Sequence, residues 1–460
     1  MNTKNIAVIL SGGSGTRFGA EKPKQYLHLA GRMIIEYTVE VFQNHPLIDE
    51  ICIIADPEFH DTLQTLCSKN HYDKARRIIR GGAQRSDSSF AAITEYGESD
   101  SDVNLIFHDA VRPFVSQSII SATIAALEKY SAVDVAIPSA DTIIQIDPED
   151  DTIDNIPVRS ILRRGQTPQA FALSTIKKAH LSLQTDLHPI SVTDDCGLVK
   201  HYLPDTPVYV VPGEERNIKI TYPEDLLFAE KLIQLNSRQL TSDQGLSLLK
   251  DQIIVIYGGN SGIGKEIAVL GSEAGAICLS FSRSNGVDLQ NASDIQSSLD
   301  QVVERYGRID HIINCAALLN QHRLDQTDET VIEEMIRTNF TGTTFLCKYG
   351  FHYLRQSQGS LTLFTSSSYT QGRPFYALYS STKAAIVNLT QALSQEWQSE
   401  NVRINAINPA RTKTPMRTQN FGEEPEDTLL DAKYVARKTL QSLLSNYSGL
   451  IIDIKKGLDG

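Results

Sequence analysis

Short apolar runs alternate with amphipathic stretches along the whole chain. In the first half these runs occupy residues 6–10, 50–55, 104–108 and 133–138, and in the second half 253–257, 276–281, 311–314, 360–365 and 402–407. Runs that are apolar on both faces are typical of strands in a parallel sheet that is covered by helices on both sides. The pattern therefore predicts an α/β fold of doubly wound sheets.

Two segments interrupt this alternation. Residues 236–252 are more polar, and we interpret them as a linker, which gives domains at 1–236 and 251–460 joined by 237–250. Residues 141–159 are rich in Asp and Ile and alternate between polar and apolar positions, which favours a hairpin arm. A chain of 460 residues is also too long for one ordinary core, so two domains are expected.

Composition narrows the classes of function. Hydrophobic residues make up 41% and charged residues 21%, as in soluble globular proteins, and the net charge of −12 argues against nucleic acid as the main partner. No apolar run approaches the roughly 20 residues that a membrane helix needs, and no signal peptide precedes the first strand. We therefore expect a cytoplasmic protein. The six cysteines form no CxxC pair and are expected to be buried thiols, and the histidines lack zinc-site spacing.

Two glycine-rich loops carry the strongest chemical signal. The first, Ser11–Arg17, reads SGGSGTR, and the second, Gly258–Gly264, reads GGNSGIG; each follows an apolar run and leads into an expected helix. A strand–loop–helix unit of this kind presents free backbone N–H groups to an anion, and glycine lets a phosphate approach closely. Two such loops indicate two phosphate-bearing ligands and two active sites.

The surroundings of the first loop suit chemistry at a nucleoside triphosphate. Arg17 and Lys24 supply cations for the phosphates, and Lys22 is either a third cation or a solvated neighbour. Asp109 follows a buried strand, where a carboxylate can hold Mg²⁺, although it could instead cap a helix. The segment 81–88 adds a second glycine turn and several hydroxyls.

The ordered segments LSGGSGTRFG, KPKQYL, GGAQRSDSS, HDAVRPF, GQTPQAF and NIKITYPEDL resemble the cytidylyltransferases that act on 2-C-methylerythritol 4-phosphate and ribitol 5-phosphate. The resemblance spans about residues 5–235. It implies that a phosphate oxygen of a polyol phosphate attacks the α-phosphorus of CTP, that pyrophosphate leaves, and that no covalent enzyme intermediate forms. The implied fold of this half is a Rossmann-like nucleotidyltransferase.

The same resemblance implies a role for individual residues. Arg17, Lys24 and Lys219 would stabilise the transition state, and Asp109 would bind Mg²⁺, with Glu215 as a candidate for a second acidic ligand. The remaining residues fall into three groups: the CTP loop comprises Ser11, Gly12, Gly13 and Gly15, cytosine recognition involves Gly82 and Ser88, and polyol-phosphate binding involves Arg159 and Thr167.

The second loop is supported by a helical pair, Tyr379 and Lys383. Residues four apart share a helix face, so the ammonium is expected to lower the pKa of the phenol. Such a tyrosine can give a proton to a ketone oxygen while hydride reaches the carbon. Ser366 or Ser367 would hold that oxygen by a hydrogen bond.

Residues 251–460 resemble the short-chain dehydrogenase/reductase family through GGNSGIG, INCAA, TNFTG, TSSS, the YxxxK pair and INPARTKTPM. The resemblance implies an NAD(P)-binding Rossmann fold and a catalytic set of Asn339, Ser366, Tyr379 and Lys383. Ser366 is preferred to Ser367 because it precedes Tyr379 by the usual family spacing. The implied cofactor contacts also include Gly258, Ser261, Gly262, Ile263, Gly264, Asp288, Asn314, Pro409 and Thr412. Tyr257, Cys315 and Ala317 depart from the family pattern.

The end of the second strand of this half suggests which cofactor is used. Enzymes that use NAD usually carry Asp or Glu there, whereas this chain has Ser282, Arg283 and Ser284. A cation and two hydroxyls suit a 2′-phosphate, so we predict NADPH. The alternative is that Arg283 is only a solvated surface residue.

Both halves together resemble the bifunctional ribulose 5-phosphate reductase/CDP-ribitol pyrophosphorylases of bacterial capsule synthesis. The implied sequence is reduction of ribulose 5-phosphate to ribitol 5-phosphate, then coupling to CTP. One alternative is a methylerythritol phosphate cytidylyltransferase fused to an unrelated reductase; another is that one half is a catalytically inactive binding module. We expect small-molecule substrates, no nucleic acid or membrane partner, and a homodimer, which both the arm and the reductase family favour.

Overall fold

The computed structural model describes residues 3–12, 22–97, 102–188, 194–240 and 245–456, with the side chains of 235–240 left out. Its contacts divide the chain into two compact units, residues 1–229 and 230–460. The division falls inside helix α7 (Pro223–Leu240), which continues past residue 236, where the sequence predicted the first domain to end. None of the described helices is both long and apolar enough to span a membrane.

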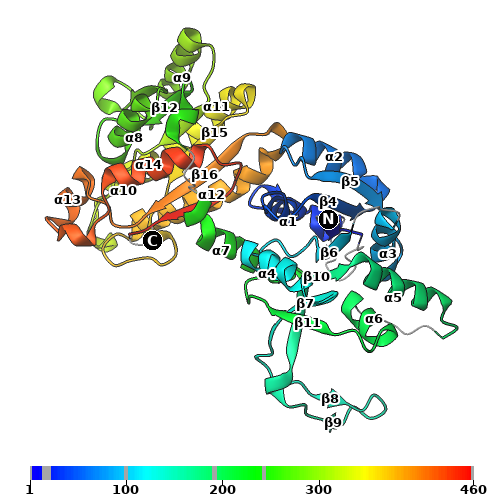
Figure 1. The fold of residues 1–460 in the computed structure, drawn as a ribbon. Coiled ribbons are helices and arrows are strands. Elements are labelled where there is room, and N and C mark those ends of the chain that lie inside the picture. The colour runs from blue at the N-terminus through cyan, green and yellow to red at the C-terminus, as the bar shows by residue number, and fades with distance from the viewer. Residues whose placement is uncertain (1–2, 13–21, 98–101, 189–193, 241–244, 457–460) are drawn as a thin grey trace. The chain divides into compact units, whose positions relative to one another are not determined.

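Unit 1 is built on a mixed sheet with the strand order β11-β7-β10-β6-β1-β4-β5 (Figure 1). Its strands are β1 (Lys4–Leu10), β4 (Glu50–Ala55), β5 (Ala75–Arg80), β6 (Val103–Asp109), β7 (Ala132–Pro138), β10 (Arg163–Ala172) and β11 (Val208–Pro212). All pairs are parallel except those of β10, which runs antiparallel to β6 and β7. The expectation of a parallel sheet is wrong for this strand, because the chain reaches β10 from β7 through an arm and not through a crossover helix.

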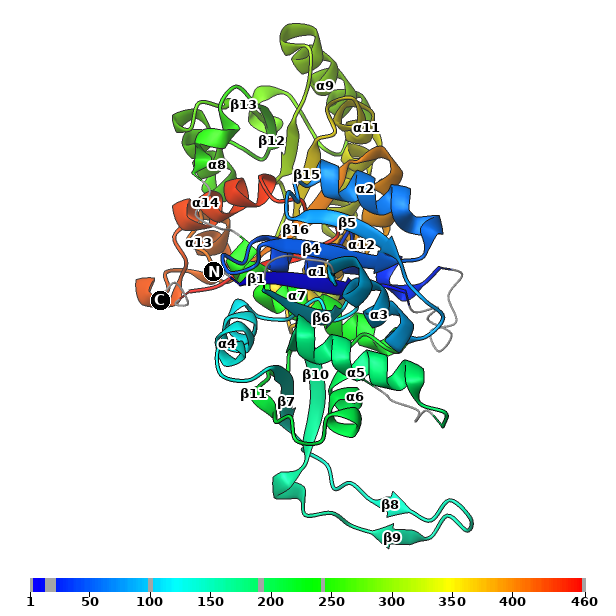
Figure 2. The ribbon, with the colours of Figure 1, turned by 45° about the vertical axis from the view of Figure 1, so that its right-hand side comes forward.

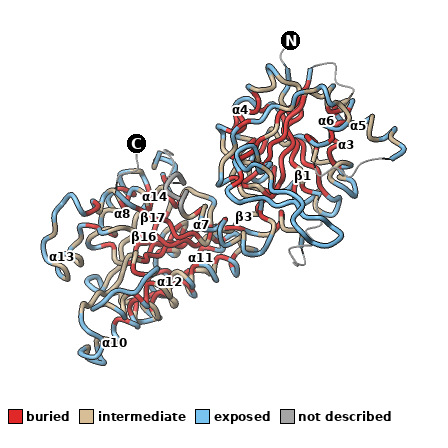
Figure 3. Tube along the Cα trace, turned by 90° about the horizontal axis from the view of Figure 1, so that it is seen from below, coloured by how far each residue is buried: buried red, intermediate tan, exposed pale blue. Residues whose placement is uncertain are grey.

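Helices cover both faces of this sheet. The bounds are α1 (Ile34–Gln43), α2 (His60–Lys69), α3 (Arg85–Tyr96), α4 (Gln117–Leu127), α5 (Leu173–Thr185) and α6 (Asp195–Tyr202). Alternate side chains of β1 enter two separate cores: Ile9 packs with Phe42 of α1, and Val8 packs with Phe107 on the opposite face. The strands accordingly form the buried centre of the unit (Figure 3).

The expected hairpin arm is present between β7 and β10. Strands β8 (Gln145–Ile146) and β9 (Ile153–Asn155) pair antiparallel and extend away from the sheet of unit 1 (Figure 2). The arm exposes many large apolar side chains, namely Ile143, Ile144, Ile146, Ile153, Ile156, Val158 and Ile161. An exposed group of this size is a mark of an interaction surface.

Unit 2 contains a parallel sheet with the order β13-β12-β14-β15-β16-β17. The strands are β12 (Ile253–Tyr257), β13 (Ile277–Phe281), β14 (His311–Asn314), β15 (Ser360–Phe364), β16 (Arg403–Pro409) and β17 (Ile451–Ile454). The helices are α8 (Gly262–Glu273), α9 (Ala292–Tyr306), α10 (Glu329–Ile336), α11 (Gly342–Ser357), α12 (Ala377–Glu396), α13 (Pro415–Phe421) and α14 (Ala432–Leu443). Helices α9, α11 and α12 bury Leu299, Leu346 and Ile386 in one core with the strands.

The strand order of each sheet reverses next to its first strand. In unit 1, β1 lies between β4 and β6, and in unit 2, β12 lies between β13 and β14. Open α/β sheets bind ligands outside the carboxyl ends of the strands at such a point. Both glycine-rich loops begin directly after these central strands, so the topology places the start of each loop at the expected binding edge.

Candidate active sites

The first glycine-rich loop begins where β1 ends. The Ser11 N–H still donates to the carbonyl of Ile54 at 2.8 Å, and Gln25 Nε2 donates to the Ser11 carbonyl at 2.6 Å. This second bond holds the segment that carries Lys24 beside the loop. The predicted residues Gly13, Gly15 and Arg17 lie outside the described residues.

The residues predicted for cytosine recognition converge beside this loop. The Gly82 N–H donates to Ser88 Oγ at 3.3 Å, and Ser88 is buried at the start of α3. Gly12 faces the same hydroxyl, because a Cβ on Gly12 would lie 3.3 Å from Ser88 Oγ. The structure therefore brings Gly12, Gly82 and Ser88 to one place.

Asp109 is the centre of a cation cluster at the carboxyl end of β6. Its Oδ1 lies 2.7 Å from Arg85 Nη1, and its Oδ2 lies 2.9 Å from Lys219 Nζ and 3.5 Å from Arg112 Nε. Burial raises the pKa of Asp109, but these three cations outweigh it and hold the pKa well below its usual range. Asp109 is not a helix cap, since Ser116 caps the following helix α4.

The NIKIT segment presents Lys219 to this carboxylate. Asn217 is fully buried and donates from Nδ2 to the Thr167 carbonyl at 2.9 Å, while its own carbonyl accepts from Arg112 Nη1 at 2.8 Å. The anchored backbone places Lys219 at Asp109, yet the lysine side chain is 45% exposed. Of the three cations around Asp109, Lys219 is therefore the one whose side chain can turn toward a ligand.

Arg85 was missed as a functional residue by the sequence analysis. The guanidinium of Arg85 contacts both Asp109 and Asp195. Its Nη2 lies 3.4 Å from Oδ2 of Asp195, which is the first residue of α6. Asp195 is 2% exposed and also accepts from Ser89 Oγ at 3.0 Å. Because the Arg85–Asp195 pair spans 110 residues, no local motif could reveal it.

The two residues predicted to hold the polyol phosphate lie in different surroundings. Thr167 Oγ1 accepts from the Asp109 N–H at 3.2 Å, so Thr167 belongs to the cluster. Arg159 lies at the base of the arm and donates to the Ala140 carbonyl at 3.4 Å. Glu215 is exposed and pairs with Arg164 at 2.7 Å, so the described contacts do not bring Arg159 or Glu215 to Asp109.

The residues of this cluster could supply only part of the coordination shell of a magnesium ion. Among the described residues no group of three or more His, Cys, Asp and Glu side chains could hold a metal. Mg²⁺ is commonly bound by one or two carboxylates together with substrate phosphates, and Asp109 stays ionised. A single carboxylate therefore suffices, provided that Lys219 leaves Oδ2.

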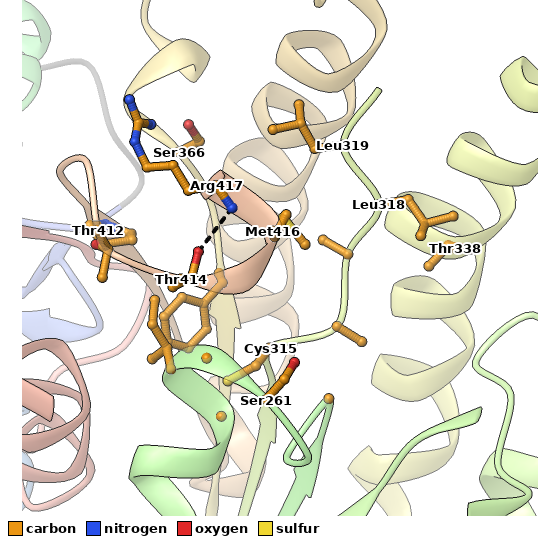
Figure 4. A pocket seen from close by; sticks show the side chains of 18 of the residues that line it. Ser261, Cys315, Leu318, Leu319, Thr338, Ser366, Thr412, Thr414, Met416 and Arg417 are labelled. Carbon is orange, nitrogen blue, oxygen red and sulfur yellow. Dashed lines mark hydrogen bonds between the residues drawn. The ribbon is translucent and has the colours of Figure 1, made fainter. Parts of the chain in front are cut away.

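In unit 2 a cavity of about 340 Å³ opens beside the second glycine-rich loop (Figure 4). Most residues predicted for this site line it: Gly258, Ser261, Gly262, Ile263, Gly264, Arg283, Asp288, Ser366, Tyr379, Lys383, Pro409 and Thr412. Asn314 and Asn339 are not among the lining residues. The cavity thus joins the glycine-rich loop to the predicted proton donor.

The glycines of this loop are required by close backbone contacts. Gly258 has a φ of +78°, and a Cβ there would lie 2.7 Å from the backbone nitrogen of Ala316. A Cβ on Gly264 would lie 2.3 Å from the Gly258 carbonyl oxygen. The tight turn leads directly into α8, whose N-terminus suits a pyrophosphate.

The predicted catalytic side chains meet at the start of α12. Lys383 Nζ donates to the Phe364 carbonyl at 2.8 Å and lies 5.6 Å from the centroid of the Tyr379 ring. Ser366 hydrogen-bonds with the Tyr379 phenol, whereas Ser367 Oγ accepts from Arg373 Nη2 at 2.9 Å. This geometry favours Ser366 over Ser367 as the partner of the substrate oxygen.

The expected pKa shift of Tyr379 is wrong for this structure. Burial raises the pKa of Tyr379 to about 12, although Ser366 and Arg417 act in the opposite direction. Burial also lowers the pKa of Lys383 to about 8. The phenol is therefore protonated at neutral pH, as a donor to a ketone oxygen must be.

Asn339 does not line the cavity but helps to hold the segments that do. It lies in a π-helical turn, Arg337–Thr341, between α10 and α11. Its Oδ1 accepts from the Leu318 N–H at 2.7 Å, and its Nδ2 donates to the Leu318 carbonyl at 2.8 Å and to Thr382 Oγ1 at 3.3 Å. Asn339 therefore ties the chain after β14 to the helix that carries Tyr379.

The lowered pKa of Lys383 predicts a pH dependence. We expect kcat/KM for the nicotinamide cofactor to fall as pH rises through about 8, because the buried ammonium then loses its proton. Initial rates at limiting cofactor between pH 6 and 10 measure this, since kcat/KM reports groups of the free enzyme. Lys383→Arg should shift the fall to higher pH; an identical profile in that variant would exclude Lys383 as its source.

The segment directly after β13 has Ser282, Arg283 and Ser284 where an NAD enzyme usually has an acidic residue. Ser282 follows β13, and Asn260 Nδ2 donates to Ser282 Oγ at 2.6 Å and to Ser284 Oγ at 2.7 Å. Arg283 is 59% exposed and lies 3.3 Å from Glu334 Oε1. This segment offers hydroxyls and a loosely paired guanidinium to a ligand.

Two family models match the two units. The model described as 2-C-methyl-D-erythritol 4-phosphate cytidylyltransferase matches residues 5–235, and the model described as short chain dehydrogenase matches residues 252–425. The limits of the first match agree with the resemblance over residues 5–235, whereas the second match starts where expected but ends at residue 425, before the predicted end at 460.

Three curated relatives illustrate these similarities. A bifunctional ribulose 5-phosphate reductase/CDP-ribitol pyrophosphorylase of Haemophilus influenzae is 46% identical over 458 residues, which is 98% of this chain and 96% of the relative. A 2-C-methyl-D-erythritol 4-phosphate cytidylyltransferase of Thermobifida fusca is 40% identical over 51% of this chain and 94% of its own. A ribitol-5-phosphate cytidylyltransferase of Lactiplantibacillus plantarum is 35% identical over 50% of this chain and 99% of its own.

Proposed function

The chain belongs to the family of bifunctional ribulose 5-phosphate reductase/CDP-ribitol pyrophosphorylases, and from this membership we propose the two reactions that it catalyses. Unit 2 reduces D-ribulose 5-phosphate to D-ribitol 5-phosphate with NADPH. Unit 1 then couples ribitol 5-phosphate to CTP, which gives CDP-ribitol and pyrophosphate. The identity with a bifunctional relative over nearly the full length of both chains carries this proposal.

In unit 1 the proposed chemistry is charge stabilisation and alignment. Lys219 leaves Asp109 Oδ2 for the phosphate oxygens as the phosphate of the polyol approaches the α-phosphorus. Arg17 and Lys24 supply further positive charge to the triphosphate, while Ser88 and Gly82 hold the base. Asp109 is the proposed ligand of Mg²⁺, which would neutralise charge on the phosphates when bound.

In unit 2 the proposed chemistry is a proton delivered beside a hydride. NADPH supplies the hydride when it is bound. Ser366 holds the ketone oxygen, and Tyr379 donates its phenolic proton to that oxygen. The hydrogen bond between Ser366 and Tyr379 keeps the two hydroxyls close together for this step. Lys383 lies below the phenol and, while charged, favours its ionised form after transfer.

The preference for NADPH is proposed to come from the Ser282–Ser284 end of the cavity. Arg283→Ala should raise KM for NADPH about 10- to 100-fold, because a charge-assisted contact to the 2′-phosphate is lost, and should leave KM for NADH nearly unchanged. Steady-state rates with each cofactor measure the change. Arg323→Ala is the matched control, since Arg323 is equally exposed and pairs with Asp325. Equal effects on both cofactors would contradict the assignment.

We further propose a cytoplasmic homodimer. The exposed apolar side chains of the arm are the support for self-association, and Arg159 lies at the base of this arm, apart from Thr167. In a dimer that buries the arm, Arg159 would lie at the surface of the second copy. Arg159 could then take part in polyol-phosphate binding there, although it lies apart from Thr167 of its own chain. The mass in solution, measured by sedimentation, tests the dimer.

The competing assignment is a methylerythritol phosphate cytidylyltransferase joined to an unrelated reductase, since relatives of that activity match the first half. Supplying CTP with either ribitol 5-phosphate or methylerythritol 4-phosphate, and measuring pyrophosphate release, separates the two. Faster release with methylerythritol phosphate would reject the proposal for unit 1. Release from neither substrate would favour an inactive binding module.

A further inference from the structure

The cavity of unit 2 is lined by arginines that no role has yet explained. Arg373 lies in the loop between Ser366 and α12, while Arg411 and Arg417 lie beside and within α13. Arg283 is at the other end, where the ribose of the cofactor is expected. In a chain with a net charge of −12, three arginines that line the same cavity as the catalytic hydroxyls point to an anionic substrate group.

The charges of these arginines are not equally neutralised. Arg417 forms a bidentate pair with Glu424, at 2.5 Å from Nε and 2.8 Å from Nη2, and Arg411 lies 3.9 Å from the same carboxylate. One carboxylate therefore serves two guanidinium groups. Arg373, in contrast, has only hydroxyl partners in the described part of the chain: Ser367 Oγ at 2.9 Å and Tyr376 Oη at 3.3 Å.

Ser367 and Tyr376, the two partners of Arg373, lie next to the proposed catalytic residues. Ser367 adjoins Ser366, the proposed partner of the ketone oxygen. The Tyr376 ring stands edge-on to the Tyr379 ring, with centroids 6.5 Å apart, and edge-on to Phe421 of α13 at 6.1 Å. Arg417 stacks on Phe421 at 4.6 Å, and Figure 4 shows Arg417 and Ser366 in the same part of the cavity.

We propose that Arg373, together with Arg417 of the same cavity, forms the subsite that binds the phosphate monoester of an open-chain ketose substrate. The guanidinium of Arg373 exchanges its two hydroxyl partners for phosphate oxygens, which bind arginine through two parallel hydrogen bonds. Ser367 and Tyr376 keep the arginine in place until then. Glu424 orients Arg417 and removes the excess charge. The proposal rests on the proposed reductase activity and adds the residues that select a phosphorylated ketose.

A different use of these cations would be to bind the pyrophosphate of the cofactor. The position of Arg373 argues against this use, because Arg373 contacts Ser367, the neighbour of Ser366, and its described partners do not include the glycine-rich loop. Steady-state kinetics distinguish the two uses. Loss of a substrate subsite changes KM for the ketose, whereas loss of a pyrophosphate contact changes KM for NADPH.

The test compares D-ribulose 5-phosphate with D-ribulose in the full-length protein. Arg373→Ala is expected to lower kcat/KM for the phosphorylated ketose about 100-fold, as for loss of a bidentate charged contact, and thereby to remove most of the preference for it over D-ribulose. Arg373→Lys should restore part of that preference. Arg355→Ala, an exposed arginine paired with Glu400 on another surface, is the control.

Two results would overturn the subsite while leaving the assignment of the reductase intact: an unchanged preference for the phosphorylated ketose, whether or not both rates fall, or a matching rise in KM for NADPH. If the wild-type protein reduces neither ketose, the proposed substrate is wrong. Calorimetric titration of inorganic phosphate into the protein saturated with NADP⁺ then decides the subsite. Binding that Arg373→Ala weakens about 10-fold or more supports it, and equal binding by both proteins rejects it.

Discussion

Replacing Tyr379 by phenylalanine is expected to lower the rate of ketose phosphate reduction by about 1,000-fold, within the range for loss of a general acid. Tyr379 is half-buried and lines the cavity, its pKa is raised to about 12 and its phenol hydrogen-bonds with Ser366, so it is a protonated donor at the place expected for the substrate oxygen. Lys383 cannot replace it, because its Nζ is engaged by the Phe364 carbonyl. NADPH oxidation at saturating substrate measures the loss.

The same variant should form CDP-ribitol normally from supplied ribitol 5-phosphate and CTP, because the two sites belong to different units. Tyr353→Phe is a suitable control, since Tyr353 also donates from its hydroxyl, to Asp300 at 2.5 Å, but lies outside the cavity. If Tyr379→Phe kept more than a tenth of the wild-type reductase rate, Tyr379 would not be the proton donor.

Replacing Lys219 by alanine is expected to lower cytidylyl transfer about 1,000-fold, comparable to the loss of a group that stabilises transition-state charge. Arg85 and Arg112 are held in the protein by buried partners, but Lys219 is 45% exposed and can follow the phosphate oxygens. Pyrophosphate release with saturating CTP and ribitol 5-phosphate measures the effect, and the reductase rate should not change.

Lys200→Ala is the matched control, because Lys200 is an exposed lysine of unit 1 whose only described partner is the Pro204 carbonyl. A loss of less than 10-fold in Lys219→Ala would contradict a direct role and would reduce Lys219 to a neutralising partner of Asp109. A comparable loss of the reductase activity would show that the variant is misfolded.

The central strands could be predicted from sequence because they are buried on both faces. The expected run 50–55 is strand β4, and 253–257 is β12. Strand β5 lacks this signal because it lies at a sheet edge and is only partly buried. Strand β10 was missed because it carries Gln166, Thr167 and Gln169, polar side chains that are buried through hydrogen bonds which only the fold creates. Strand β17 is buried at all four positions and was nevertheless missed.

The candidate sites were predictable where a motif is local. Tyr379 and Lys383 are four residues apart on one helix, and Asp109 directly ends a strand. Arg85 and Arg373 were missed because their partners are remote or unremarkable in sequence: Arg85 pairs with Asp195 across 110 residues, and Arg373 bonds two hydroxyls. The pKa of Tyr379 was mispredicted because burial cannot be read from helical spacing.

The two reactions in one chain are tested most directly by a single incubation. The full-length protein is mixed with D-ribulose 5-phosphate, NADPH, CTP and Mg²⁺, and the products are identified by mass. We predict CDP-ribitol, with one NADPH oxidised and one pyrophosphate released per molecule formed. NADPH oxidation without a CDP-alcohol, or a CDP-alcohol that forms without NADPH, would contradict the account.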